Sequence, residues 1–575
     1  MNQALLAEIV RSYPLELVEA ASTALVLVVA LATPRFGEGF FRRLERAGGG
    51  LARRKTLAVA LAGLAPMVLR AALLPIAGVP EPGLTDEFSH LLTADTLASG
   101  RLTNPTHPMW PFFEAPHVFH RPVYASMYPP AQGVILAGGQ ALTGVPWIGV
   151  WLSVGLMGAA LCWMLQGWLP PGWALFAALL AGLRLGTVSY WMNSYWGGAP
   201  AAIGGALALG AVARLRRRPR VIDSLLLGTG LSLLVNSRPF EAVLLGLTIG
   251  PALSFIALPS RGGWTRTATV FAPALAVLAI AGAADGYYQW RVTGSPWRLP
   301  YQVNRQTYGW PQTFYWQPAL PPGTYAQETM HGYYLWERAL HDRGRTLRGF
   351  ALATVGKLKA FWPFFLGPAL TPFVLVLPRA AADRRLRLLA AVCLVMAVAL
   401  SGYGFFFAHY AAPMVGALVA LLGQGMRHVR VWRWHGQPTG RAAVRLTAAV
   451  CGAMLLLAAI TRPEVPPEQP MLGWRPPSWY MSAPGSPRER VREQLEAQPG
   501  RHLLLVRYPP DHDVRREWVY NGASIDAERI VWAHDMGPQK NGEIIGHFGG
   551  RRIWSLTWHD GQPRLAPYAG GSPPR

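Results

Sequence analysis

The sequence predicts a polytopic α-helical membrane protein with a small α/β domain at its C-terminal end. Three observations support this prediction: the composition, the spacing of long apolar runs and the distribution of charge. Of the 575 residues, 51% are hydrophobic and 14% are charged, against about a quarter charged in an ordinary soluble domain. A soluble enzyme, a disordered chain and a coiled coil do not have this composition.

The apolar runs are long enough, or nearly long enough, to cross a bilayer, which takes about 20 helical residues. They predict about 12 spans, and several are short enough that their edges are approximate. The runs cover residues 19–33, 56–79, 147–167, 172–190, 198–213, 221–237, 239–258, 267–284, 351–377, 388–404, 405–425 and 446–462.

The formal net charge of +23 lies mainly in short arginine-rich clusters between these runs. The clusters at 35–55, 214–220, 379–387 and 427–445 all fall on one side of the membrane when the spans alternate strictly. Basic loops are typical of the cytoplasmic side, so the intervening segments are predicted to lie outside. A nucleic-acid-binding protein would gather its charge on one soluble face, so we expect no nucleic-acid partner.

This topology divides the chain into three parts. Residues 1–55 form an N-terminal span and a basic cytoplasmic loop, 56–462 form the transmembrane core, and 463–575 form an extracytoplasmic α/β domain. The core carries two long outer loops, 80–146 and 285–350.

Short patterns refine two of these parts. A proline-rich linker at 463–487 leads to a predicted helix at 488–497 and to strand-like runs at 503–508, 529–533 and 553–558. The apolar stretch 131–143 would reverse the sidedness of 214–220 if it crossed the membrane. It is therefore predicted to be a short helix at the outer interface.

The cysteines offer no disulfide framework. Cys162, Cys393 and Cys451 all lie inside apolar runs, where a cysteine behaves as a small hydrophobic residue. The outer segments are therefore expected to fold without disulfides.

An acidic pair opens the first outer loop. Asp86 and Glu87 begin a predicted helix of about 87–99 that Gly100 closes. One interpretation is structural, because acids are favoured at helix N-termini. The other is chemical, because a carboxylate held just outside the bilayer can take a proton from a hydroxyl group.

Later in the same loop, Tyr128-Pro129-Pro130 precedes the apolar helix. In this order and spacing, the acidic pair and the Pro-Pro motif resemble the GT-C class of membrane glycosyltransferases, in particular the protein O-mannosyltransferase and lipid A aminoarabinose transferase relatives. The resemblance covers about residues 56–260 and implies a GT-C-like core with Asp86 and Glu87 as catalytic residues.

The resemblance also implies a reaction and a location. We expect inverting transfer of a sugar from a polyprenyl-phosphate donor to a protein, lipid or glycan acceptor. The location it implies is the outer face of a bacterial inner (plasma) membrane, with membrane lipids as further partners.

The donor phosphate needs a cation at an outer helix end. Relatives usually carry a basic residue close after the Pro-Pro motif, but this chain has Gln132 and Gly133 there. Arg238, in the predicted turn before a span, is the first candidate, and Lys357 and His409 are further ones. Alternatives are a local pair with Glu241 for Arg238 and snorkelling to the interface for Lys357.

An aromatic stretch at 189–198 predicts a substrate cavity, with an interfacial aromatic belt as the alternative. The aromatic loop 285–350 is expected to cover that cavity. The predicted cavity residues are His90, Tyr128, Tyr190, Asn193, Tyr195 and Trp196.

No cofactor is predicted, with a divalent metal as an alternative. Glu87-x-x-His90 and Glu114-x-x-His117-x-x-His120 contain metal-ligating residue types in one loop. Pro116 disfavours a helix through the second motif, so its spacing does not place the three side chains on one face.

Two other functions remain open: a transporter or flippase of lipid-linked saccharides, and a non-catalytic assembly protein. A transporter needs charged residues deep in its spans and is often built from repeats. Acidic residues are scarce in mid-span here, since Asp223 and Glu241 both lie near predicted span ends. The sequence therefore favours an integral-membrane glycosyltransferase.

Overall fold

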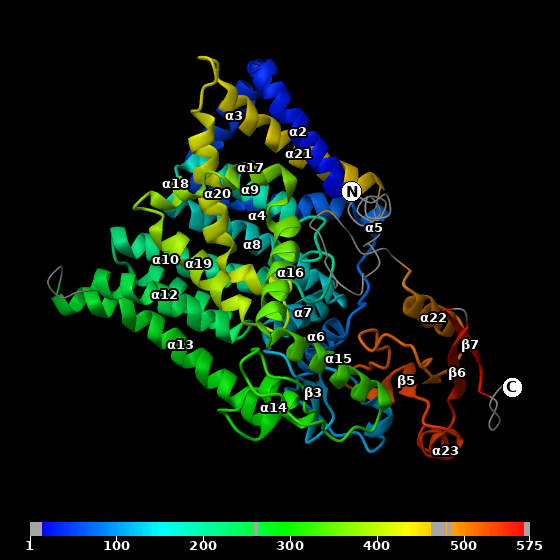
Figure 1. The fold of residues 1–575 in the computed structure, drawn as a ribbon. Helices are drawn as coiled ribbons and strands as arrows, with labels where there is room; N and C mark the ends of the chain where they lie inside the picture. Colours follow the sequence, from blue (N-terminus) through cyan, green and yellow to red (C-terminus); the bar gives the residue numbers. More distant parts are fainter. Residues whose placement is uncertain (1–13, 258–262, 462–478, 480–484, 560, 569–575) are drawn as a thin grey trace.

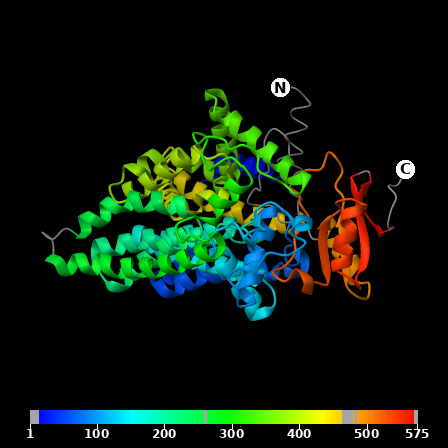
Figure 2. The same ribbon diagram turned by 90° about the horizontal axis from the view of Figure 1, so that it is seen from below.

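The computed structural model describes residues 14–257, 263–461, 479, 485–559 and 561–568. A helical body makes up most of the molecule, and a mixed α/β domain formed by the C-terminal residues lies at one end (Figure 1). Figure 2 shows the segment around residues 80–130, in blue, between that domain and the helices.

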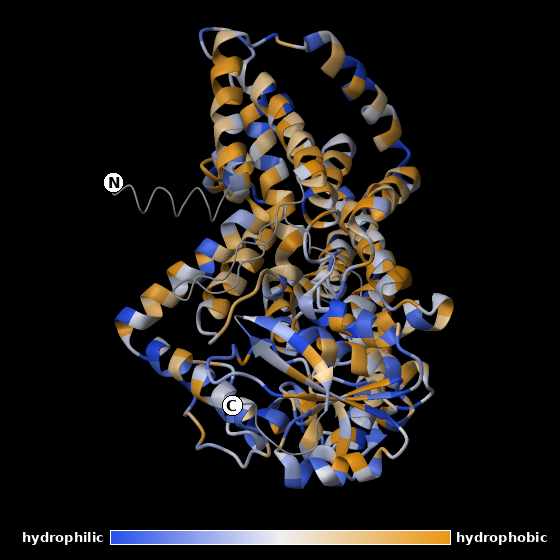
Figure 3. Cartoon of the chain, turned by 90° about the vertical axis from the view of Figure 1, so that its right-hand side faces the viewer, coloured by the Kyte–Doolittle hydropathy of each residue, from blue (hydrophilic) through white to orange (hydrophobic). Residues whose placement is uncertain are grey.

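Each predicted apolar run coincides with one or more helices, which confirms the helical membrane architecture (Figure 3). In the ranges 14–257 and 263–461, six helices are long and apolar enough to cross a membrane. They are α2 (Pro14–Ala32), α4 (Lys55–Ala72), α8 (Trp147–Trp168), α12 (Pro239–Ala257), α13 (Gly263–Thr293) and α21 (Thr439–Thr461). The count of about 12 spans stays a prediction.

The other helices of the body are shorter or less apolar. They are α9 (Pro171–Leu185), α10 (Ala199–Arg217), α11 (Val221–Val235), α16 (Leu347–Phe365), α17 (Gly367–Val374), α18 (Leu377–Ala382), α19 (Arg387–Ser401) and α20 (Val415–Arg430).

Three predicted spans are not continuous helices. The run 56–79 divides into α4 and the short α5 (Leu74–Ala77). The run 351–377 breaks between α16 and α17, where Gly367 adopts a left-handed φ of 57°. The run 405–425 begins as the 3-10 helix η3 (Ala408–Met414), which contains Pro413, and only then becomes α20. A proline cannot donate to the helical ladder, and this accounts for the irregular start.

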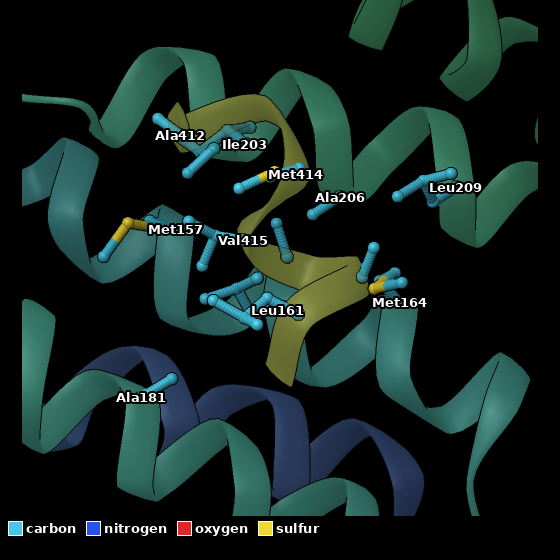
Figure 4. Packing of buried hydrophobic residues seen from close by; sticks show 14 of the residues in the cluster. Met157, Leu161, Met164, Ala181, Ile203, Ala206, Leu209, Ala412, Met414 and Val415 are labelled. Carbon is cyan, nitrogen blue, oxygen red and sulfur yellow. The ribbon is translucent and has the colours of Figure 1, made fainter. Parts of the chain in front are cut away.

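Helix α8 lies at the centre of the core and packs against α4, α9 and α10. Figure 4 shows Met157, Leu161 and Met164 of α8 among apolar side chains of α10, η3 and α20. On α10, a Cβ atom at Gly205 would lie 2.0 Å from the Pro413 carbonyl oxygen. Only glycine permits this approach, so Gly205 fixes η3 against the core.

The N-terminal helix α2 is attached to the core by a buried ion pair. The Arg184 guanidinium on α9 lies 2.9 Å from the Glu19 carboxylate on α2. Arg184 also donates to the carbonyl oxygens of Pro363 (2.8 Å) and Phe364 (3.2 Å), and Glu19 accepts from the Trp479 indole (2.8 Å). Because partners surround both charges, the pair fixes how α2 packs.

A second ionic cluster joins three helices at the end of the body that carries the basic segments. Glu45, on the strongly amphipathic α3 (Glu38–Arg53), accepts bidentate hydrogen bonds from Arg430 and Arg445 at 2.8–3.0 Å. Partial burial alone would raise the pKa of Glu45, but the two guanidinium groups outweigh it and lower this pKa to about 2. Helix α3 was predicted only as a basic loop.

The segment 80–146 contains α6 (Thr85–Ala98), the short η1 (Trp110–Phe113) and α7 (Ala131–Thr143). The predicted helices at 87–99 and 131–143 are thus confirmed, with Gly100 at a left-handed φ of 75° just after the first. A three-stranded sheet lies between them, in the order β1-β3-β2: β1 (Asn104–Pro105), β3 (Val123–Ser126) and β2 (Val118–Phe119). The segment 285–350 adds α14 (Pro300–Thr307) and α15 (Glu328–Gly344).

The C-terminal domain has a four-stranded sheet in the order β5-β4-β6-β7. Strand β4 (His502–Val506) pairs in parallel with β5 (Ile530–His534) and β6 (Arg552–His559), and β7 (Gln562–Pro567) is antiparallel to β6. The helix predicted at 488–497 is α22 (Pro487–Glu496), and the three predicted strands are present. Strand β7, the 3-10 helix η4 (Ile525–Ala527) and helix α23 (Pro538–His547) were not predicted.

This domain shares a hydrophobic core with α6. The Phe88 ring stacks on the Tyr520 ring with centroids 4.7 Å apart, and the Arg488 guanidinium lies 4.5 Å from the Phe88 ring. The Tyr520 hydroxyl donates to the Pro116 carbonyl (2.7 Å), and the Ala523 amide donates to Asp95 (2.6 Å). The start of α6 is therefore held from the side of the C-terminal domain.

The Glu45 cluster generates a pH-dependent prediction. Because the pKa of Glu45 falls from 4.5 to about 2 on folding, its stabilising contribution is complete above pH 4.5 and is lost as the pH falls toward 2. Glu45→Gln should lower the Tm in detergent at pH 7 by roughly 1–3 °C, since the cluster is partly exposed. Near pH 2 the two proteins should converge. An equal difference at both pH values would contradict this account.

Candidate active site

The two residues of the acidic pair face different surroundings. Glu87 is buried, and its carboxylate accepts three backbone hydrogen bonds, from Gly83 (2.8 Å), Leu84 (3.0 Å) and Tyr195 (2.9 Å). Burial raises the pKa of Glu87 to about 7, although the three amides oppose this shift. Both carboxylate oxygens are engaged, so Glu87 joins the start of α6 to the 190–198 segment.

Asp86 is the accessible member of the pair. The Tyr128 hydroxyl donates a hydrogen bond to its Oδ1, and its Oδ2 lies 3.8 Å from Nδ1 of His117. Its side chain keeps 23% of its surface exposed, whereas Glu87 beside it is buried. Asp86 therefore has a carboxylate oxygen that a substrate can approach.

His117 is buried and lies next to Asp86 on the side of the protein interior. Its backbone has a positive φ of 68°, which is strained for a residue other than glycine. The Ser89 hydroxyl donates to its carbonyl (2.7 Å), and the Tyr333 hydroxyl lies 3.0 Å from its Nε2. Burial lowers the pKa of the His117 imidazole, so the ring is neutral near pH 7. From the sequence, His117 was identified only as an alternative metal ligand. No residue pattern predicts a left-handed backbone conformation at a histidine.

Arg238 lies in the turn between α11 and α12, with its guanidinium 3.8 Å from the Tyr410 ring centroid. Within the described ranges, no carboxylate oxygen comes within 4.0 Å of its nitrogens. Glu241, the local partner considered above, is buried and accepts from the Tyr403 hydroxyl (3.3 Å). The guanidinium therefore has no carboxylate at ion-pair distance, although the charge of Glu241 acts on it from farther away.

The segments that carry Tyr128 and Arg238 are joined by a hydrogen bond from the Ala131 amide to the Asn236 carbonyl (3.0 Å). Three rings from different parts of the chain, His90, Tyr301 and Tyr410, lie within electrostatic reach of both Asp86 and Arg238. His90 stacks on Tyr128 with ring centroids 4.7 Å apart. Burial lowers the pKa of His90 to about 4, so this ring adds no charge near pH 7.

Beside Arg238, three further predicted residues form a buried wall. The Tyr190 hydroxyl lies 3.0 Å from Nδ1 of His409 and accepts from the His409 amide (2.9 Å). The Trp196 and His409 ring centroids are 4.8 Å apart. The structure thus brings together seven predicted residues: Asp86, His90, Tyr128, Tyr190, Trp196, Arg238 and His409.

Two predicted cavity residues have structural contacts instead. Asn193 is buried, accepts from Nε of Arg70 (2.7 Å) and donates to the carbonyls of Thr187 and Ser189 (3.2 and 2.9 Å). The Tyr195 hydroxyl donates to the Pro80 carbonyl (2.8 Å). Their polar groups hold the 187–195 segment in place.

Lys357 is also engaged elsewhere. Its ammonium group donates to the carbonyls of Leu400 (3.3 Å), Ser401 (2.5 Å) and Tyr403 (2.5 Å), at the C-terminal end of α19. A lysine has three donors, so this capping arrangement uses all of them. The phosphate-binding role predicted for Lys357 would require these bonds to break.

The position after the Pro-Pro motif is closed to a phosphate-binding side chain. The Gln132 amide donates to the Tyr195 carbonyl (2.7 Å), and a Cβ atom at Gly133 would lie 2.3 Å from Cγ2 of Thr93 on α6. Helix α7 packs so tightly on α6 that a side chain has no room at position 133, and the Gln132 side chain is engaged with the 190–198 segment.

The metal-ligand alternatives are separated from one another. Glu114 accepts from the amides of Ala326 (2.7 Å) and Gln327 (3.0 Å), and His120 stacks on Tyr124 at 5.3 Å. These contacts belong to packing between loops.

A different group, His107, Asp526 and His547, brings its ligand atoms within 4.8 Å of one another. Its geometry fits hydrogen bonds: the Met109 amide donates to Nδ1 of His107 (3.0 Å), which leaves the proton on Nε2, 3.2 Å from Asp526. A protonated Nε2 has no lone pair to offer a cation.

The sequence matches no protein-family model and no curated protein. Solved structures are similar in fold. ArnT from Cupriavidus metallidurans in the apo state has 13% identity and a TM-score of 0.47, with 87% of this chain and 93% of that chain covered. The same protein bound to undecaprenyl phosphate has 12% identity and a TM-score of 0.46 over the same shares.

The Archaeoglobus fulgidus oligosaccharyltransferase in complex with Zn and sulfate has 13% identity and a TM-score of 0.44. The similarity covers 87% of this chain and 67% of that chain.

The contrast between the two acids generates a stability prediction. Glu87→Gln replaces one acceptor oxygen by an NH₂ group that must face a backbone N–H, which should cost about 1–3 kcal/mol. Asp86→Asn keeps an acceptor for Tyr128 and should leave stability unchanged. Thermal unfolding followed by tryptophan fluorescence checks both. A stable Glu87→Gln protein beside an unstable Asp86→Asn protein would reverse the assignment.

Proposed function

We propose that the protein is a membrane glycosyltransferase that uses a polyprenyl-phosphate sugar as its donor. One observation supports this most directly: an accessible carboxylate, Asp86, and a guanidinium without a close ion pair, Arg238, both act electrostatically on the rings of His90 and Tyr301. Such a pair can serve the two ends of a glycosyl transfer, because one removes a proton and the other neutralises a leaving phosphate.

The proposed chemistry is a single displacement with inversion. The acceptor hydroxyl oxygen attacks the anomeric carbon and forms the new glycosidic bond. The bond between that carbon and the phosphate oxygen breaks, and the phosphate leaves with the electron pair. Asp86 takes the hydroxyl proton, and the hydrogen bond from Tyr128 keeps its carboxylate oriented.

Arg238 is placed for a donor whose lipid remains in the bilayer. It lies at the end of two helices of the apolar body, so its guanidinium can reach a phosphate at the membrane boundary. The wall of Tyr190, Trp196 and His409 beside it would then contact the sugar or the phosphate.

The side of the membrane follows from the direction of α10. This helix begins at Ala199, next to the wall residue Trp196, and ends in Arg214, Arg216 and Arg217 about 28 Å away. If these arginines face the cytoplasm, the site and the C-terminal domain face the outer side. We therefore place the reaction on the outer face of a bacterial inner membrane.

Transfer itself is the first test. Asp86→Asn should lower sugar transfer by about 100-fold or more, because the acceptor then lacks its base. The assay is purified protein with a polyprenyl-phosphate sugar and a membrane extract, with released polyprenyl phosphate as the readout. Asp342→Asn, at a 46% exposed carboxylate on α15, is the matched control and should be fully active. Normal turnover by Asp86→Asn would remove the proposed base.

Arg238 tests use of the donor. Arg238→Ala should lower kcat/KM for the donor roughly tenfold to over a hundredfold, and Arg238→Lys should recover only part of it, since lysine cannot grip phosphate in a bidentate way. Arg345→Ala, at an exposed arginine, serves as the control. A flippase would instead show Arg238-dependent lipid movement in sealed vesicles and no release of polyprenyl phosphate, which would overturn the proposed reaction.

A further inference from the structure

A groove outside the candidate active site lies along the end of α13 that leads to α14. It has a volume of about 510 Å³ and is formed between one face of α13 and the turn that follows it. Its lining combines small residues, three aromatic rings, a carboxylate and an amide. The lining is Gly282, Ala283, Asp285, Gly286, Tyr287, Gln289, Trp290, Pro296 and Trp297.

The aromatic rings are exposed to an unusual degree. Trp297 keeps 89% of its surface exposed, Tyr287 51% and Trp290 50%. An interfacial belt accounts for aromatic rings at this level of a membrane helix. It does not account for Asp285, the acidic residue in the same lining.

Asp285 is the feature that indicates a ligand. It follows directly on an apolar stretch of α13, and Gln289, itself buried, donates to its carboxylate (2.6 Å). Across the described parts of the chain, no Arg, Lys or His nitrogen comes within 4.0 Å of this carboxylate. Placing a carboxylate at a membrane boundary without a nearby cation costs free energy, because the charge loses part of its hydration. Such residues usually serve a function.

The helix that carries the groove also packs near the candidate active site. Tyr288, next to the groove residue Tyr287, is buried in a cluster that includes Tyr128 and Tyr301. Tyr128 donates to Asp86, and Tyr301 lies within electrostatic reach of both Asp86 and Arg238. The turn that closes the groove, with Pro296 and Trp297, therefore leads directly into α14, which carries Tyr301.

From this arrangement we propose that the groove binds saccharide units of the acceptor, so that the acceptor is a glycan or carries one. The inference rests on the proposed glycosyltransferase function. Sugar rings have apolar C–H faces that fit exposed indoles and hydroxyl edges that fit a carboxylate and an amide. A polyprenyl phosphate suits this groove poorly, because Asp285 repels its charge.

Direct binding tests this proposal without turnover. The probes are maltotriose, mannotriose and chitotriose, titrated by calorimetry into the full-length protein in detergent without donor. At least one should bind, and Trp297→Ala and Asp285→Asn should each weaken that binding about tenfold or more. Trp264→Ala is the matched control, since Trp264 is 80% exposed at the opposite end of the same helix.

Three results would overturn the inference: no trisaccharide binds, binding survives the Trp297→Ala/Asp285→Asn double variant, or Trp264→Ala weakens it equally. Quenching of Trp297 emission by brominated phospholipids, together with no saccharide binding, would identify the groove as part of a lipid-facing belt.

Kinetic measurements test saccharide binding in the groove independently of the proposed glycosyl transfer. With a glycan acceptor, Trp297→Ala should raise the acceptor KM and leave kcat unchanged. Asp86→Asn should abolish transfer and bind the trisaccharide as wild type does. If every variant loses transfer but binds the trisaccharide as wild type does, the groove has no role in the reaction. If the wild-type protein transfers sugar but binds no trisaccharide, only the groove proposal is contradicted and the proposed reaction stands.

Discussion

Three backbone N–H groups converge on the buried carboxylate of Glu87, and the arrangement of the site depends on that convergence. Two of them, from Gly83 and Leu84, come from the turn that starts α6, and the third, from Tyr195, comes from a segment more than a hundred residues later. The single side chain therefore fixes Asp86 on one side and the wall of Tyr190 and Trp196 on the other. A buried carboxylate oxygen that loses its hydrogen bond raises the free energy of the folded state. Neither segment can therefore move away from Glu87 without destabilising the protein.

The same convergence separates the roles of two adjacent acids. Glu87 points into the protein, where its charge is compensated by amides, and Asp86 points to the accessible side, where Tyr128 is its hydrogen-bond donor. Successive helical residues are about 100° apart around the axis, so adjacent acids face different directions. One acid joins two distant segments, and the other keeps an exposed carboxylate.

Packing from two further directions holds α6 in place. The C-terminal domain contributes Tyr520 and Arg488, which stack on the Phe88 ring. The segment 285–350 contributes Tyr333, whose hydroxyl contacts His117 behind Asp86, and its own helices are joined by the buried Arg305–Glu337 ion pair. The domain that looks separable in the sequence is thus part of the framework around Asp86.

The sequence by itself determined the helical, apolar character of the body, because the length and composition of an apolar run are local properties. It also identified the acidic pair, the helix after Pro130 and Arg238, since helix starts and turns have recognisable residue types. The sequence does not indicate which of Asp86 and Glu87 is exposed. Nor does it indicate that Lys357 caps α19 or that Asn193 accepts a hydrogen bond from Arg70. Those assignments depend on which distant backbone groups approach each side chain. The positive φ of His117 and the approach of η3 to Gly205 are likewise consequences of packing. Only the tertiary structure brings such partners together, because their separation along the chain contains no information about their distance in space.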